Sequence, residues 1–110
     1  MADELLVSHS TLHGFTSSLF AAAGMPAAHA DMVAEILCWA EFRGVESHGV
    51  ERIPRYLDLL ANGQMNAGAE PQVRDVAGAA FAIDADKASG LVAMTMAADE
   101  AEKRARAGCF

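Results

Sequence analysis

Apolar residues recur at helical spacing in the N-terminal part of the chain, and Gly24 and Pro26 divide this pattern in two. The first helix is predicted to begin at Ser8 or Ser10, whose hydroxyl can accept a free backbone N–H of the first turn, and to end at Gly24. The second is predicted to begin at Pro26 and to end at Gly44. We expect the two helices to pair as a hairpin, because each carries an apolar stripe: Leu12, Phe15, Leu19 and Phe20 in the first, and Met32, Val33, Ile36, Leu37 and Ala40 in the second.

A third helix is predicted from about Ser47 to Asn62, with Gly63 ending it. Its apolar residues lie three or four positions apart: Val50, Ile53, Leu57 and Leu60. Pro54 is its weak point, because a proline ring inside a continuous helix clashes with the carbonyl four residues earlier. The sequence therefore predicts a kink or a short first turn there.

The C-terminal part of the chain has a different pattern. Residues 64–71 have the composition of a loop, and two short strands are predicted over 73–76 and 79–84, with Phe81 and Ile83 on one face. A turn then leads to a long helix over 91–107, which Gly108 ends. The predicted order of three helices, two strands and one helix places the chain in the α/β class, as an α+β segment.

Composition limits the class of function. The chain has 110 residues, which allows one domain at most, and its 8 basic against 15 acidic residues give a net charge of −7. We therefore expect neither nucleic acid nor an anionic membrane surface as a partner. The N-terminus lacks the basic start of a secretory signal, and Gly24 and Pro26 interrupt the longest apolar stretch. Two cysteines without metal-site or CxxC spacing suit a cytoplasmic location, with Cys38 as a core residue.

The densest polar cluster runs from Arg43 to Arg52, between the second and third helices. If the segment after Ser47 is helical, His48 and Arg52 are four residues apart and share a face. An imidazole that transfers protons near neutral pH would then lie beside a guanidinium that matches a carboxylate, as reduction of a 2-oxo acid requires. The alternative is structural: His48 caps a helix, and Arg52 pairs on the surface with Glu46 or Glu51.

Other polar groups favour structural interpretations. His9 and His13 have helical spacing but lack the further ligands that zinc needs, so no metal site is predicted, and His29 is interpreted as a surface residue. Asp84 and Asp86 are typical of a turn, and Ser89-Gly90 alone is a weak phosphate-binding signal. The sequence contains neither GxGxxG nor GxxxxGK[ST], so no Rossmann or P-loop cofactor site is predicted.

The run from Ser47 to Tyr56, Ser-His-Gly-Val-Glu-Arg-Ile-Pro-Arg-Tyr, followed by Gly63-Gln-Met-Asn66, resembles the malate/L-lactate dehydrogenase family of the non-Rossmann type, which includes ureidoglycolate dehydrogenase and diketogulonate reductase. The resemblance implies a homodimer that uses NADH or NADPH to interconvert 2-hydroxy and 2-oxo acids, or to reduce cyclic imines. It implies that His48 is the proton donor, that Arg52 binds the substrate carboxylate, and that Ser47 assists by hydrogen bonding.

The resemblance also bears on domain organisation. It implies a helical segment over residues 1–63 that carries the Ser-His-Gly motif, and over 64–110 the beginning of a cofactor domain with a mixed sheet. Because Cys109-Phe110 resembles the start of another buried strand, we expect the chain to be the N-terminal part of a larger protein, with the cofactor-binding residues, unknown here, beyond Phe110. The alternative is a small acidic helical interaction module without catalysis.

Overall fold

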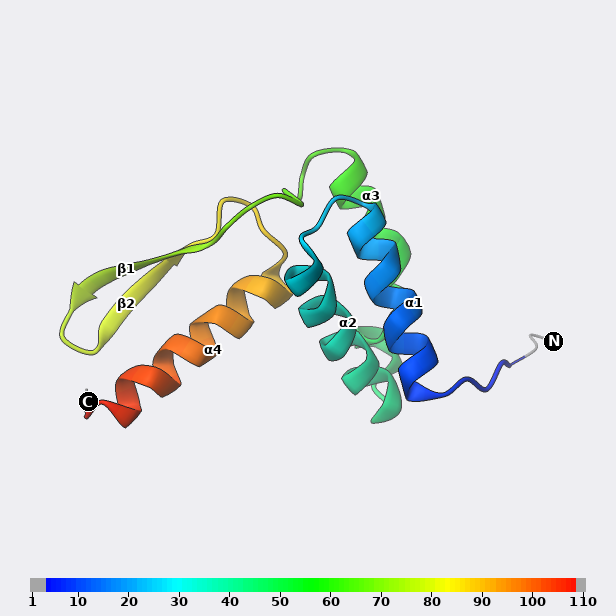
Figure 1. Ribbon diagram of the computed structural model, residues 1–110, viewed down its shortest axis with the longest axis horizontal. Coiled ribbons are helices and arrows are strands. Elements are labelled where there is room, and N and C mark those ends of the chain that lie inside the picture. The colour runs from blue at the N-terminus through cyan, green and yellow to red at the C-terminus, as the bar shows by residue number, and fades with distance from the viewer. Residues whose placement is uncertain (1–3, 109–110) are drawn as a thin grey trace.

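The computed structural model describes residues 4–108 and begins with a helical hairpin. Helix α1 (His9–Ala22) begins where the Ser8 hydroxyl accepts the Thr11 N–H at 3.2 Å, and α2 (Ala27–Phe42) begins directly after Pro26. Both helices end as the glycines predict, since Gly24 and Gly44 have φ values of +106° and +76°. The two helices pack side by side (Figure 1), which confirms the predicted hairpin.

The predicted third helix is wrong in its first part. Residues 46–52 form two separate 3₁₀ turns, η1 (Glu46–His48) and η2 (Val50–Arg52), and the α-helix proper, α3 (Ile53–Ala61), begins only afterwards. Pro54 lies in the first turn of α3, where the N–H that proline lacks has no helical partner to lose. The expected short first turn at Pro54 is thus confirmed, and the continuous helix through Gly49 is not.

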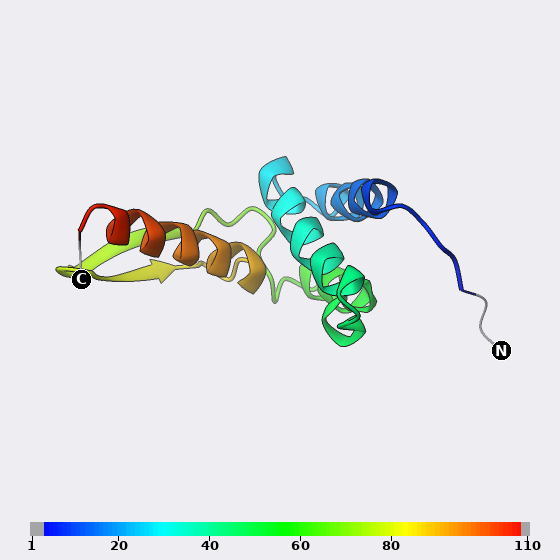
Figure 2. The same ribbon diagram turned by 90° about the horizontal axis from the view of Figure 1, so that it is seen from below.

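The C-terminal part has the predicted order. Strands β1 (Gln72–Ala77) and β2 (Ala80–Asp84) pair antiparallel, with Val73 opposite Ile83 and Asp75 opposite Phe81, and α4 (Gly90–Arg106) follows. The strand pair lies along α4 in both views (Figures 1 and 2). The larger mixed sheet remains a prediction, as does the division between residues 63 and 64.

Arg104 fastens the strand pair to α4. Its guanidinium forms ion pairs with Asp75 on β1 and Glu100 on α4, donates to the Gly78 carbonyl, and lies 4.9 Å from the centre of the Phe81 ring. Phe81 therefore faces α4, as the alternation along the strand predicts.

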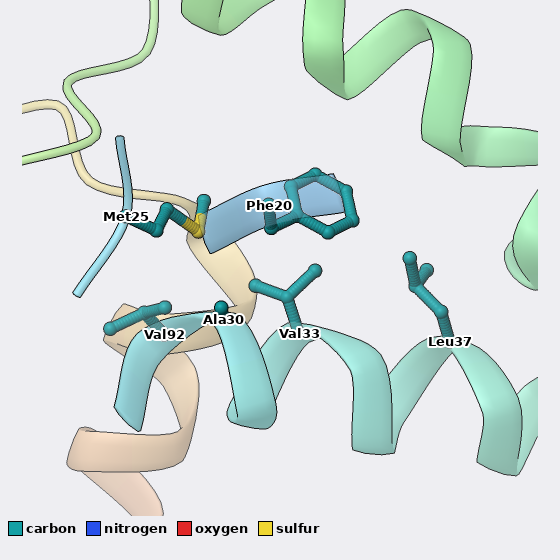
Figure 3. Packing of buried hydrophobic residues seen from close by; sticks show 6 residues of the cluster. All are labelled: Phe20, Met25, Ala30, Val33, Leu37 and Val92. Carbon is teal, nitrogen blue, oxygen red and sulfur yellow. The ribbon is translucent and has the colours of Figure 1, made fainter. Parts of the chain in front are cut away.

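The hydrophobic core joins the helical hairpin to α4 (Figure 3). Phe20 of α1 and Val33 and Leu37 of α2 are fully buried, and Val92 from the first turn of α4 belongs to the same buried cluster. Residues of α3 pack on this cluster from the other side, with half-buried Ile53, Tyr56, Leu57 and Leu60. The start of α4 is thus held beside α2 and near the segment with the Ser-His-Gly motif.

The turn before α4 is backbone-strained and tied to the loop that follows α3. Asp86 and Lys87 both have positive φ, at 50° and 62°, a region that residues other than glycine rarely adopt. Asn66 supports them, because its N–H donates to the Lys87 carbonyl at 2.8 Å and its side-chain amide donates to the Asp86 carboxylate at 3.3 Å. These contacts fix the direction in which α4 starts.

Two side chains of α2 test the burial predictions. His29 is not a surface residue: it is buried, with Nε2 3.7 Å from a Glu70 carboxylate oxygen, because the loop before β1 folds over the start of α2. Cys38 is buried and free, as predicted, and burial raises the pKa of its thiol. Within residues 4–108, no helix has the length and apolar character needed to cross a bilayer.

The core makes a prediction about stability. Replacing the fully buried Phe20 by Ala should lower the free energy of unfolding by about 3–5 kcal/mol, since the ring leaves a cavity in a close-packed cluster. Phe15→Ala on the same helix is the matched control, because the Phe15 side chain is 60% exposed and its loss should change stability by no more than about 0.5 kcal/mol. Urea unfolding followed by circular dichroism measures both, and equal losses would contradict the assignment of Phe20 to the core.

Candidate functional site

The candidate site lies where the chain turns back at the end of α2. Gly44 reverses its direction, and the Val45 N–H donates to the Ala40 carbonyl at 3.0 Å, so that η1 starts beside the last turn of α2. The three residues that the sequence singles out, Ser47, His48 and Arg52, all lie in the two 3₁₀ turns that follow.

Ser47 joins the other two residues. Its hydroxyl oxygen lies 2.9 Å from Nδ1 of His48, and its carbonyl oxygen accepts a hydrogen bond from Nε of Arg52 at 2.6 Å. His48 and Arg52 are therefore brought together, but not on one face of a helix as the spacing predicts. Gly49 separates the two turns, and the Arg52 side chain folds back onto η1 instead.

The structure does not have the surface ion pair between Arg52 and Glu46 or Glu51 that the alternative interpretation predicts. Ion pairs among residues 4–108 involve other cations, and neither Glu46 nor Glu51 pairs with the Arg52 guanidinium. The donor groups at its tip are left without a carboxylate partner in the described part of the chain. A planar guanidinium in this state can bind an incoming carboxylate through two parallel hydrogen bonds.

An apolar cavity of about 340 Å³ lies beside His48. Besides His48 it is lined by Tyr56 of α3, Leu91 of α4 and a wall from the second half of α2 and the turn after it: Ile36, Leu37, Trp39, Ala40 and Val45. Arg43 stacks over the exposed Trp39 ring at 4.3 Å. The cavity thus combines a proton-transfer group, a phenol and apolar walls, a composition typical of small-molecule sites.

Glu41 is a polar residue at this junction that the sequence analysis did not single out. One of its carboxylate oxygens accepts the Val50 N–H at 2.9 Å, at the start of η2. Gly49 is packed closely against the Glu41 backbone, since a Cβ at position 49 would lie 3.2 Å from the Glu41 Cα. The available signal was the acidic side chain in the last turn of a helix, where the negative end of the helix dipole disfavours it.

The remaining candidates have structural partners. The Asp84 carboxylate binds Arg74 at 2.6 Å and accepts the Asp86 N–H, and the Ser89 hydroxyl accepts the Leu91 N–H at the start of α4. The His9 ring packs on the Phe42 ring at a tilt of 46°, and Nε2 of His13 lies 3.6 Å from a Glu35 carboxylate oxygen. No group of three metal-binding side chains occurs among residues 4–108.

Comparison with known proteins identifies the family. The sequence model described as malate/L-lactate dehydrogenase matches residues 7–109. The chain belongs to this family. The family model thus covers the whole candidate site and confirms the resemblance carried by the Ser47–Tyr56 run.

Relatives in this family are oxidoreductases. Ureidoglycolate dehydrogenase (NAD(+)) of Escherichia coli K12 is 33% identical over 100 residues, which are 91% of this chain and 29% of that protein. Malate dehydrogenase from Pyrococcus horikoshii OT3 superposes with a TM-score of 0.88 at 32% identity, over 96% of this chain and 31% of that one. Delta1-piperideine-2-carboxylate reductase from Pseudomonas syringae pv. tomato superposes with a TM-score of 0.86 at 32% identity, over 96% of this chain and 32% of that one.

Two consequences follow from these matches. The chain spans less than a third of the length of the relatives it matches. Its helix-rich fold with one antiparallel strand pair is the fold of the corresponding part of family dehydrogenases. The relatives do not favour the alternative of an interaction module without catalysis.

Proposed function

We propose that the protein is an oxidoreductase that uses NADH or NADPH to interconvert 2-oxo and 2-hydroxy acids, or to reduce cyclic imino acids. The observation that carries this proposal is the hydrogen-bonded group of Ser47, His48 and Arg52, in which His48 lines an apolar cavity. The substrates named for the relatives, ureidoglycolate, malate and piperideine-2-carboxylate, are all small carboxylates, which supports the same substrate class.

His48 is the proton donor in this proposal. Its Nδ1 is occupied by the Ser47 hydroxyl, which leaves Nε2 as the ring nitrogen for a substrate oxygen. A hydroxyl can donate to a neutral ring and accept from a protonated one, so the ring keeps its hydrogen bond in both states. Ser47 therefore holds the ring in place while the proton leaves and returns.

Arg52 binds the substrate carboxylate in this proposal. Its Nε is held by the Ser47 carbonyl, which fixes the plane of the guanidinium, while its terminal nitrogens have no carboxylate partner within residues 4–108. The carboxylate and the carbonyl of a 2-oxo acid are adjacent, so this proposal requires the Arg52 terminal nitrogens and His48 Nε2 to face one ligand.

The nicotinamide supplies the reducing equivalents in this proposal. Only the proton transfer and the carboxylate binding are assigned to the described residues around His48. The family resemblance is the basis for proposing a homodimer, and two cysteines without CxxC or metal-site spacing are the basis for proposing a cytoplasmic location. The net charge of −7 is the basis for proposing that nucleic acid and anionic membranes are not partners.

Turnover tests the function directly. The complete gene product should oxidise NADH or NADPH, each tested separately, with at least one substrate from a panel of 2-oxo acids and cyclic imino acids, or reduce NAD or NADP with ureidoglycolate-type hydroxy acids. The change in nicotinamide absorbance is the measurement. A folded protein that turns over no member of the panel would contradict the proposal.

The proton donor is tested by His48→Ala. We expect kcat to fall about 10²–10⁴-fold, the usual contribution of a general acid, with the fold retained because His48 is exposed. His9→Ala is the control, since His9 is also exposed but lies in α1 away from the cavity. Equal kcat values for the wild type and His48→Ala would remove His48 from the mechanism.

The carboxylate site is tested by Arg52→Lys. A lysine keeps the charge but loses the planar pair of donors and the Nε bond to Ser47, so KM for the acid should rise roughly tenfold to a hundredfold. Arg55→Lys, an exposed arginine on α3, should leave KM within about twofold of the wild-type value. Steady-state kinetics with the acid as the varied substrate separate the two, and a KM unaffected by Arg52→Lys would refute the assignment.

A further inference from the structure

The Glu41 carboxylate occupies an unfavourable position for its charge. It lies in the last turn of α2, where the backbone carbonyls make the helix end negative. Its oxygen accepts the Val50 N–H at 2.9 Å, and η2 begins at Val50. A carboxylate that accepts a backbone N–H at the start of a turn is stabilised by that bond. This interaction explains why an acid is accommodated at the end of α2.

Gly49 allows the turn to approach Glu41. Its φ of −96° lies outside the left-handed region that favours glycine. Space requires a glycine here: the residue is buried, and a Cβ would lie 3.2 Å from both Cα and Cβ of Glu41 and closer still to its carboxylate. The peptide between residues 49 and 50 is thus held directly against the end of α2.

Gly49 links both parts of the candidate site through its two backbone groups. The Gly49 N–H donates to the Glu46 carbonyl in η1 at 3.0 Å, and the Gly49 carbonyl accepts the Arg52 N–H in η2 at 3.0 Å. His48 directly precedes it, and the Arg52 side chain spans back from η2 to Ser47. A shift of the 49–50 peptide would therefore move His48 and Arg52 relative to α2, which forms one wall of the cavity.

We propose that Glu41 is a positioning residue of the proposed reaction: its carboxylate fixes the 49–50 peptide on α2 and thereby sets the place of His48 at the cavity. This inference rests on the proposed function, and it assigns Glu41 no proton transfer. The hydrogen bond needs only an acceptor oxygen, so the amide of glutamine can replace it.

The kinetic test compares Glu41→Ala with Glu41→Gln in the complete gene product. Glu41→Ala should lower kcat about tenfold to a hundredfold with KM for the acid changed less, because small displacements of a reacting group cost rates of that order. Glu41→Gln should restore kcat to within about threefold of the wild-type value. Glu51→Ala, an exposed acid in η2, is the control and should leave kcat unchanged. A glutamine variant as slow as the alanine variant would overturn the inference.

A second measurement follows the hydrogen bond between the Val50 N–H and the Glu41 carboxylate directly. Hydrogen–deuterium exchange of the peptide that contains Val50 should be roughly tenfold to a hundredfold faster at that amide in Glu41→Ala than in the wild type, and close to wild type in Glu41→Gln. Unchanged exchange in a folded Glu41→Ala variant would also overturn the inference. This readout does not depend on catalysis.

A double mutant separates positioning of His48 from general destabilisation. If Glu41 acts through His48, adding Glu41→Ala to His48→Ala should leave the residual rate unchanged, whereas independent effects would multiply. Multiplying effects would overturn the inference.

A wild-type protein without turnover would refute the proposed function and, with it, the role of Glu41 in that reaction. An active wild type with unaltered Glu41→Ala kinetics would refute only the role of Glu41.

Discussion

The contact between the first turn of α4 and the helical hairpin is the interaction on which the rest of the structure depends. Val92 is buried in the same cluster as Phe20, Val33 and Leu37, and this cluster joins the N-terminal helices to α4. Beyond this turn, α4 extends away from the hairpin and lies along β1 and β2 (Figure 1), which Arg104 contacts through Asp75 and Phe81. The same turn brings Leu91 to the cavity beside His48, so the core and the candidate site share one anchoring point.

The candidate site lies at a helix end, where backbone groups without partners inside the helix can bind other segments of the chain. The last turn of α2 supplies the carbonyl that accepts the Val45 N–H and the carboxylate that accepts the Val50 N–H. It also forms part of the cavity wall. Two short 3₁₀ turns then present side chains at closely defined positions, because each is bonded at its ends to the preceding one or to α2. A continuous helix from Ser47 would have carried His48 and Arg52 past α2 instead of folding them against it.

Local signals in the sequence predicted most of the fold. Ser8, Gly24, Gly44 and Pro54 each act through their own backbone chemistry, and each marks the boundary that the structure has. The errors arose where tertiary contacts decide. The close approach of Gly49 to Glu41 replaces a predicted helical turn, and a distant loop covers His29. Spacing along the chain carries no information about either contact, because the partners lie on different elements.

The candidate residues themselves were found from the sequence, but their arrangement was not. The pattern placed a histidine and an arginine four positions apart, and the structure joins them through both polar groups of Ser47, with the hydroxyl to the imidazole and the carbonyl to the guanidinium. Ser47 therefore couples the group proposed to move a proton to the group proposed to bind a carboxylate. Any movement of η1 displaces both together, so their contributions to a common reaction are expected to be non-additive. The hydrogen bond from the Val50 N–H to Glu41 bears on both groups for a related reason: the peptide that it holds follows His48 by one residue and accepts the Arg52 N–H through the Gly49 carbonyl.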